Sequence, residues 1–194
     1  MDRNQPAFPC MGNTTHSESD GEKFMSIGLL ILRVVAGLTL AAHGSQKLFG
    51  WFGGYGLAGT GGFLEQLGFF PGRRNALFAG LAEAVGGLLL ALGLFTPLAA
   101  ATIIAVMTVA SVSVHLKHGF FNHMQGYEYT MMLAVIALSV AITGPGAISL
   151  DAVLGVHAAG PAWGLAAAVL GLAGAGIQLA GRRVPVPQET QQAS

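Results

Sequence analysis

One short stretch of the sequence, residues 43–54, concentrates groups that can do chemistry. It ends a strongly apolar segment and holds an imidazole at His43, an amine at Lys47 and four glycines. His43 and Lys47 stand at positions i and i+4, so on a helix they share one face. An imidazole exchanges protons near neutral pH, and an ammonium group stabilises a neighbouring negative charge. We therefore expect these two side chains to belong to a functional site.

Other titratable residues lie inside the apolar segments or at their ends. Arg33 and Glu83 each stand within an apolar run. A charge at the centre of a bilayer costs about 2.5–3.5 kcal/mol, so such residues usually pair or line a cavity. We expect Arg33 and Glu83 to take part in structural ion pairing. The candidate catalytic residues are His43, Lys47, Glu83, His115 and Glu128.

The histidines and the cysteine give little support for a metal or thiol site. His115 and His118 stand three residues apart, and such a pair can bind a metal or a haem. Histidines at a membrane boundary more commonly only form hydrogen bonds, so we assign no metal ligand and disfavour haem. Cys10 is the one cysteine, so neither an internal disulfide nor a Cys-x-x-Cys redox pair can form within one chain.

Composition determines the class of protein. Apolar residues make up 53% of the chain and charged residues 9%, whereas globular domains carry about 25% charged residues. The net charge is zero, which gives no electrostatic basis for binding nucleic acid. The chain is therefore predicted to be an all-α integral membrane protein whose partner is the lipid bilayer.

The apolar segments predict a four-helix transmembrane bundle with a fifth C-terminal transmembrane helix, each span having roughly the 20 residues that a bilayer requires. The expected spans are residues 26–46, 76–95, 97–117, 128–143 and 161–181. The expected domains are a disordered tail over 1–25, a four-span membrane domain over 26–153, the additional helix over 161–181 and a disordered tail over 184–194. Met25 directly precedes the first apolar run, so translation from Met25 is a further hypothesis.

Alternating crossings of the bilayer bring the polar ends of several spans to one membrane face. The residues expected there are His43, Lys47, His115, Lys117, His118, His123 and Glu128. Glu83 lies within reach of the same face. The distribution of lysine and arginine places this face in the cytoplasm, together with the C-terminus and the first connector. That connector, residues 48–75, is too polar to span, and its apolar residues predict a short amphipathic helix at the interface.

Small residues indicate how the helices pack. One face of the second span carries Gly80, Ala84, Gly87 and Ala91, and one face of the last span carries Gly164, Ala168, Gly171 and Ala175. Small residues let membrane helices approach closely. These faces predict close packing of helices or subunits, and homo-oligomerisation through them is one expectation. Asp151 follows a Gly-Pro-Gly turn and is expected to cap the next short helix.

Several motifs follow one another in a defined order. They are Leu32-Arg33-x-x-x-Gly37, His43-Gly44-x-x-Lys47-Leu48-Phe49-Gly50, Leu81-Ala82-Glu83-x-x-Gly86-Gly87-Leu88, Gly93-Leu94-x-Thr96-Pro97, His115 with Gly119-Phe120-Phe121, Gly126-Tyr127-Glu128-Tyr129, and Gly144-Pro145-Gly146-x-x-Ser149-Leu150-Asp151. This order resembles the DoxX family of small bacterial membrane proteins over residues 27–153. The last span and both tails lie outside the resemblance.

The resemblance implies a multi-pass protein of the bacterial inner membrane with a link to redox work. Relatives are named as subunits of a thiosulfate–quinone oxidoreductase, and others are tied to membrane-associated oxidoreductase complexes in thiol and oxidative-stress balance. The chain would then be the membrane subunit or anchor of an oxidoreductase system. The family pattern defines no catalytic residues, so none is transferred with a known role.

If the chain is redox-active, quinone is the expected cofactor. His43 or His115 would hydrogen-bond a quinone carbonyl, Lys47 would stabilise the reduced anion, and Glu83 or Glu128 would relay protons. No dinucleotide fingerprint occurs in a strand–helix context, because the glycines lie in and between spans, so electrons would come from a soluble or membrane redox partner protein. The alternative is a non-enzymatic scaffold, or a small transporter whose pathway is lined by Arg33 and Glu83. Whether the chain is itself an enzyme stays open, since it has no self-contained catalytic motif.

Overall fold

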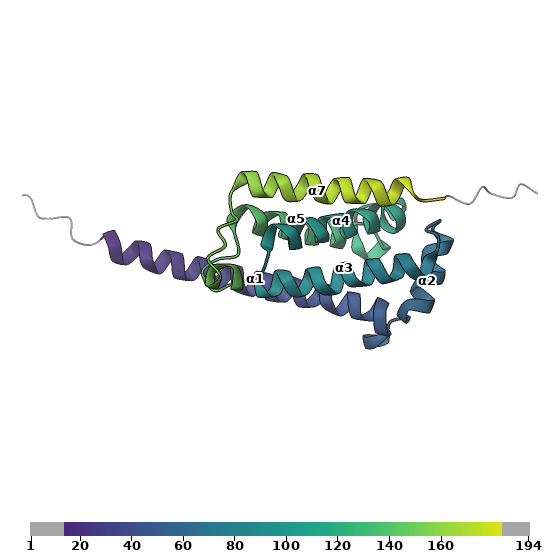
Figure 1. The fold of residues 1–194 in the computed structure, drawn as a ribbon, viewed down its shortest axis with the longest axis horizontal. Coiled ribbons are helices and arrows are strands. Elements are labelled where there is room, and N and C mark those ends of the chain that lie inside the picture. Colours follow the sequence, from purple (N-terminus) through teal and green to yellow (C-terminus); the bar gives the residue numbers. More distant parts are fainter. Residues whose placement is uncertain (1–13, 184–194) are drawn as a thin grey trace, which may run out of the picture.

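The computed structural model describes residues 14–183, which form a bundle of long helices joined by short helical turns (Figure 1). The long helices are α1 (Thr14–Phe49), α3 (Gly72–Leu92), α4 (Thr96–Ala110), α5 (Glu128–Thr143) and α7 (Pro161–Ala180). The short helices are α2 (Gly56–Gln66) and α6 (Leu150–Val153). Single turns cover Trp51–Gly53, Leu116–His118 and Asn122–Met124, and a π-helical turn covers Ser111–His115.

The helices have the lengths and apolarity of membrane spans. By these two criteria the segments that can cross a bilayer are Asp20–Phe49, Gly72–Leu92, Thr96–His118 and Pro161–Ala180. α5 is also apolar but shorter, with 16 residues. The predicted all-α transmembrane bundle, including its C-terminal helix, is therefore confirmed.

Successive long helices run in opposite directions, and α4 lies at the centre of the bundle (Figure 1). α4 packs against α3, α5 and α7, and it contributes much of the buried apolar core, including Ala99, Ala100 and Ile103. The break between α3 and α4 is local. Gly93 takes a left-handed conformation with φ of 62°, which ends α3, and Pro97 stands in the first turn of α4, where a missing N–H costs nothing.

Glycines set the contact between α1 and α3. A Cβ placed at Gly44 would lie 2.4 Å from the backbone nitrogen of Ala84, and one at Gly37 would lie 2.4 Å from the carbonyl oxygen of Gly87. The small-residue face of the second span thus packs on α1. The face of α7 packs within the chain too, because Gly171 contacts Ile104 of α4. Glycines of both small-residue faces therefore contact other helices of the same chain.

Some boundaries differ from those expected. α1 begins at Thr14, so residues 14–25 are helical and not disordered. Extending an existing helix needs no new nucleus, and the extension carries an i,i+3 ion pair between Asp20 and Lys23. The rest of the predicted N-terminal tail and the predicted C-terminal tail lie outside the described residues. The expected interfacial helix of the first connector is α2.

Candidate functional site

An ion pair between α1 and α3 is the centre of the candidate site. Lys47 Nζ donates to Glu83 Oε2. The Glu83 side chain is 4% exposed and that of Lys47 is 30% exposed. Side chains on a helix tilt toward its N-terminus, so the long Lys47 side chain reaches back from the end of α1 into the bundle. The close approach of Gly44 to Gly80 and Ala84 brings the two helices near enough for this contact.

His43 and Tyr129 extend the site to a third helix. His43 lies one turn before Lys47 on α1, and Tyr129 lies in the first turn of α5. The centroids of their rings are 5.8 Å apart in an edge-on arrangement. The site thus joins an imidazole, a phenol, an amine and a carboxylate from three helices.

A chain of hydrogen bonds sets the tautomer of His43. The Gln46 amide nitrogen Nε2 donates to the carbonyl oxygen of Phe52 at 3.2 Å. The amide oxygen of Gln46 therefore faces His43 Nδ1, at 3.0 Å, and can only accept. Nδ1 carries the proton in the neutral ring, which leaves Nε2 with a free lone pair. Neutral His43 is thus suited to accept a hydrogen bond or a proton at Nε2.

His115 and Glu128 have a different setting, in the connector between α4 and α5. His115 Nδ1 donates to the carbonyl oxygen of Gln125 at 2.7 Å, so its Nε2 is also the free nitrogen. Glu128 Oε2 accepts from the backbone nitrogen of Asn122 at 2.9 Å. Both residues therefore hold the connector in place. Within residues 14–183, no hydrogen bond or ion pair links either of them to Lys47 or Glu83.

The end of the third span departs from α-helical geometry. Ser111–His115 form a π-helical turn, a rare feature that occurs frequently at functional sites. The hydroxyl groups of Ser111 and Thr130 lie 2.6 Å apart, which connects this turn to α5. The sequence shows no sign of this turn, because its residues continue the apolar and polar pattern of an α-helix.

Arg33 lies in a second polar cluster and does not pair with Glu83. It is fully buried, and its Nη2 donates to the carbonyl oxygen of Ile148 at 2.6 Å. Nη1 lies 3.4 Å from the carbonyl oxygen of Ala91. The sequence suggested ion pairing for Arg33, but among the described residues no carboxylate lies within ion-pair distance of it. Backbone carbonyls satisfy much of its hydrogen bonding instead.

Asp151 anchors this second cluster by capping α4. Its carboxylate accepts from the backbone nitrogens of Phe95 at 2.8 Å and Thr96 at 3.0 Å, and from the Thr96 hydroxyl at 2.7 Å. The expectation that Asp151 caps the next short helix is wrong. Ser149 caps α6, because its hydroxyl accepts from the backbone nitrogen of Ala152 at 3.2 Å. A carboxylate at the N-terminus of α4 is favoured by the exposed N–H groups there.

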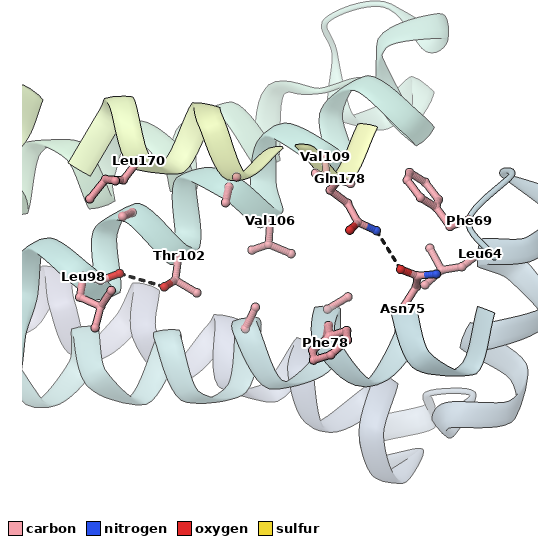
Figure 2. A pocket seen from close by; sticks show the side chains of 15 residues that line it. Leu64, Phe69, Asn75, Phe78, Leu98, Thr102, Val106, Val109, Leu170 and Gln178 are labelled. Carbon is pink, nitrogen blue, oxygen red and sulfur yellow. Dashed lines mark hydrogen bonds between the residues drawn. The ribbon is translucent and has the colours of Figure 1, made fainter. Parts of the chain in front are cut away.

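The chain also has an apolar groove of about 450 Å³ between α3, α4 and α7 (Figure 2). None of the candidate catalytic residues lines it. No three His, Cys, Asp or Glu side chains lie close enough together in residues 14–183 to hold a metal ion. The groups suited to chemistry are therefore those around Lys47 and Glu83.

Comparison with known proteins gives the family. The DoxX family model matches residues 28–116. The protein "Putative oxidoreductase CatD" of Bacillus subtilis is 30% identical over 129 residues, which are 66% of this chain and 88% of that protein. The chain belongs to the DoxX family. An "Uncharacterized protein" of Haemophilus influenzae is 32% identical over 133 residues, 67% of this chain and 92% of that one. No solved structure matches.

The family match divides the site. Arg33, His43, Lys47 and Glu83 lie inside the residues matched by the DoxX model, whereas Tyr129 lies outside them. Tyr129 and Gln46 are the two members of the site that sequence reasoning missed. The signal for Tyr129 was its place beside Glu128, in a span that begins on the same membrane face as His43.

Proposed function

We propose that this DoxX protein is the quinone-binding membrane subunit of an oxidoreductase system in the bacterial inner membrane. The observation that carries the proposal is the partly buried Lys47–Glu83 ion pair between two spans, with His43 one turn before Lys47 and the Tyr129 ring against that of His43. Ionisable groups inside a membrane are costly and usually mark a functional site. The name of the Bacillus subtilis relative supports a redox role.

The residues present fit a quinone in its reduced form. A quinone carries two electrons and two protons between its oxidised and reduced states. His43 Nε2 has a free lone pair, so it would hold a ring hydroxyl and accept its proton, as general bases do. This refines the expectation from sequence, in which His43 donates to a carbonyl. Lys47 would stabilise negative charge at the ring oxygen, and Glu83 balances Lys47 when the site is empty of ligand.

Electrons have to pass to or from another protein. The chain has one cysteine and therefore no internal dithiol couple. Its glycine-rich segment at residues 54–59 follows no strand among the described residues, so it lacks the strand–helix context of a dinucleotide fingerprint. A soluble or membrane redox partner would supply or remove the electrons, while this chain binds the quinone and moves protons. Lys47, His115 and Lys117 lie at one end of the bundle, and this end is where we place the partner.

A transporter pathway through Arg33 and Glu83 has less support. Arg33 is fully buried and donates to the carbonyl oxygens of Ile148 and Ala91. Glu83 is bound to Lys47. The two residues therefore belong to separate polar clusters, each with its own partners. A scaffold without redox activity is the outcome if no quinone binds.

The proposal is tested by ligand-induced stabilisation. Purified protein in detergent is heated with increasing concentrations of a short-chain benzoquinol, and the unfolding temperature is recorded. Wild type and Lys117→Gln, which removes an exposed charge near the same end, should shift upward by several degrees. His43→Ala and Glu83→Gln should lose more than half of that shift. Equal shifts in all four proteins, or none in wild type, would refute the proposal.

A further inference from the structure

The apolar groove has walls from α3 and α7 and a floor from α4 (Figure 2). Its lining includes Phe78 from α3, Ala105 from α4 and Leu170 from α7. Phe78 and Leu170 are 62% and 63% exposed, so the groove opens toward the surrounding lipid. A hydrocarbon chain can therefore enter it sideways from the bilayer.

Polar groups close one end of the groove. The Gln178 amide nitrogen donates to the Asn75 amide oxygen at 2.9 Å, which joins α7 to α3 (Figure 2). The third polar lining residue, Thr102, donates to the carbonyl oxygen of Leu98 at 2.9 Å. These side chains have partners already, so the wall of the groove offers mainly apolar contact. The apolar wall would therefore contact the hydrocarbon tail of a ligand. Its polar head would lie beyond Asn75 and Gln178.

Arginines surround that end of the groove. Arg182 lies just after the end of α7, and its guanidinium carbon lies 5.8 Å from the centre of the Phe69 ring, which lines the groove. Its Nε donates to the carbonyl oxygen of Leu67 at 2.5 Å. Within the described residues, neither terminal nitrogen of Arg182 forms a hydrogen bond. This guanidinium can therefore bind an anion with both of them.

The neighbouring charges have the same sign. Arg73 and Arg74 are exposed and directly precede Asn75, and Arg74 stands one turn before Phe78 on α3. The Arg183 backbone nitrogen donates to the carbonyl oxygen of Gly68 at 2.8 Å, which holds the end of the last helix against this region. The acid nearby is Glu65, whose carboxylate accepts from the backbone nitrogen of Gly72 at 2.8 Å. The mouth of the groove is therefore strongly basic.

We propose that the groove binds one acyl chain of an anionic phospholipid, whose phosphate lies between Arg74 and Arg182. Basic pockets between membrane helices bind anionic lipid headgroups, and arginine matches phosphate geometry with paired hydrogen bonds. A quinone has an uncharged head and would leave the arginines without a counter-charge. The charge at the mouth therefore favours the phospholipid. Bound lipid fills the space between α3 and α7 and stabilises the docking of α7.

Lipid-dependent thermal stability tests the proposal. The full chain is purified in a neutral detergent, stripped of lipid, and heated with phosphatidylglycerol or phosphatidylcholine of identical acyl chains. Phosphatidylglycerol should raise the unfolding temperature by several degrees more than phosphatidylcholine. Arg74→Gln should remove more than half of this difference. Lys23→Gln, which removes an exposed charge near the start of α1 at the opposite end of the bundle, should leave it intact.

A second pair of variants separates charge from packing. Arg182→Lys keeps the charge but not the paired geometry, so it should lose part of the phosphatidylglycerol response. Ala105→Phe fills the floor of the groove and should reduce the number of phosphatidylglycerol molecules that native mass spectrometry finds on the protein. Equal stabilisation by the two lipids, or equal lipid counts in Ala105→Phe and wild type, would overturn the proposal. Loss of benzoquinol binding in Ala105→Phe would assign the groove to quinone and overturn it as well.

Discussion

The ammonium group of Lys47, near the end of α1, forms an ion pair with the carboxylate of Glu83 within α3. Each residue supplies the charge that the other needs in a span, so neither charge is left unpaired in the bundle. The contact depends on glycine packing between the helices, and it lies one helical turn from His43, whose ring contacts Tyr129. The fold and the proposed chemistry therefore rest on the same pair.

Removing one partner of the pair should destabilise the protein more than removing both. Glu83→Leu leaves Lys47 without a counter-charge, and breaking a buried pair costs about 3–5 kcal/mol. Because Lys47 is 30% exposed, we expect a loss of about 3 kcal/mol in the free energy of unfolding. The double variant Lys47→Met/Glu83→Leu should recover most of this loss. Unfolding in detergent by a mixed-micelle titration gives the free energies for this double-mutant cycle.

Additive effects of the two substitutions would contradict the pairing. In that case the double variant would be less stable than both single variants, Lys47→Met and Glu83→Leu. Lys47 and Glu83 would then not interact in the folded protein.

Bulk at the α1–α3 contact should separate the two helices. A Cβ at Gly44 would meet the backbone nitrogen of Ala84 at 2.4 Å, and backbone cannot rotate away. Overpacking typically costs about 1–3 kcal/mol, so Gly44→Leu should lower stability by at least that much and weaken quinol binding. Gly28 has no atom within 4 Å of its Cβ position, which makes Gly28→Leu the matched control on the same helix. Similar unfolding temperatures for the two variants would show that α1 and α3 do not pack closely at Gly44.

The cap on α4 should matter more than an exposed carboxylate. Asp151 accepts hydrogen bonds from two backbone nitrogens and from the Thr96 hydroxyl, and it is 1% exposed. Asp151→Ala leaves these donors without a partner, so we expect a loss of about 3 kcal/mol. Asp20→Ala, at the exposed start of α1, should change stability by less than about 1 kcal/mol. Equal losses in the two variants would mean that the Asp151 carboxylate does not cap α4.

The spans and their alternating directions follow from the sequence because hydropathy alone places them. Alternation then brings His43, Lys47 and the start of α5 to one end of the bundle, and Glu83 was expected within reach of that end. The choice of partner does not follow in this way. Whether Glu83 meets Arg33 or Lys47 depends on the rotation of each helix and on side-chain reach, and neither has a sequence signal.

Contacts between segments far apart in the chain could not be predicted from the sequence either. Asp151 was assigned to the nearest helix because capping signals are local, yet it caps a helix that begins 55 residues earlier. Tyr129 was noted only as part of a sequence motif and not as a site residue. Its ring, on α5, contacts that of His43 on α1. To predict the groove, one must know that α7 lies beside α3 and α4. Hydropathy does not determine this arrangement of the helices.

The quinone content of the purified protein tests the central claim most directly. Wild type and Lys47→Met/Glu83→Leu are purified in mild detergent from bacterial membranes, and quinone is extracted and quantified per mole of chain by mass spectrometry. The proposed function predicts bound quinone in wild type and a decrease of about tenfold in the double variant, which corresponds to about 1.4 kcal/mol of binding free energy. Equal quinone content in two equally folded proteins, or no quinone in wild type, would contradict it.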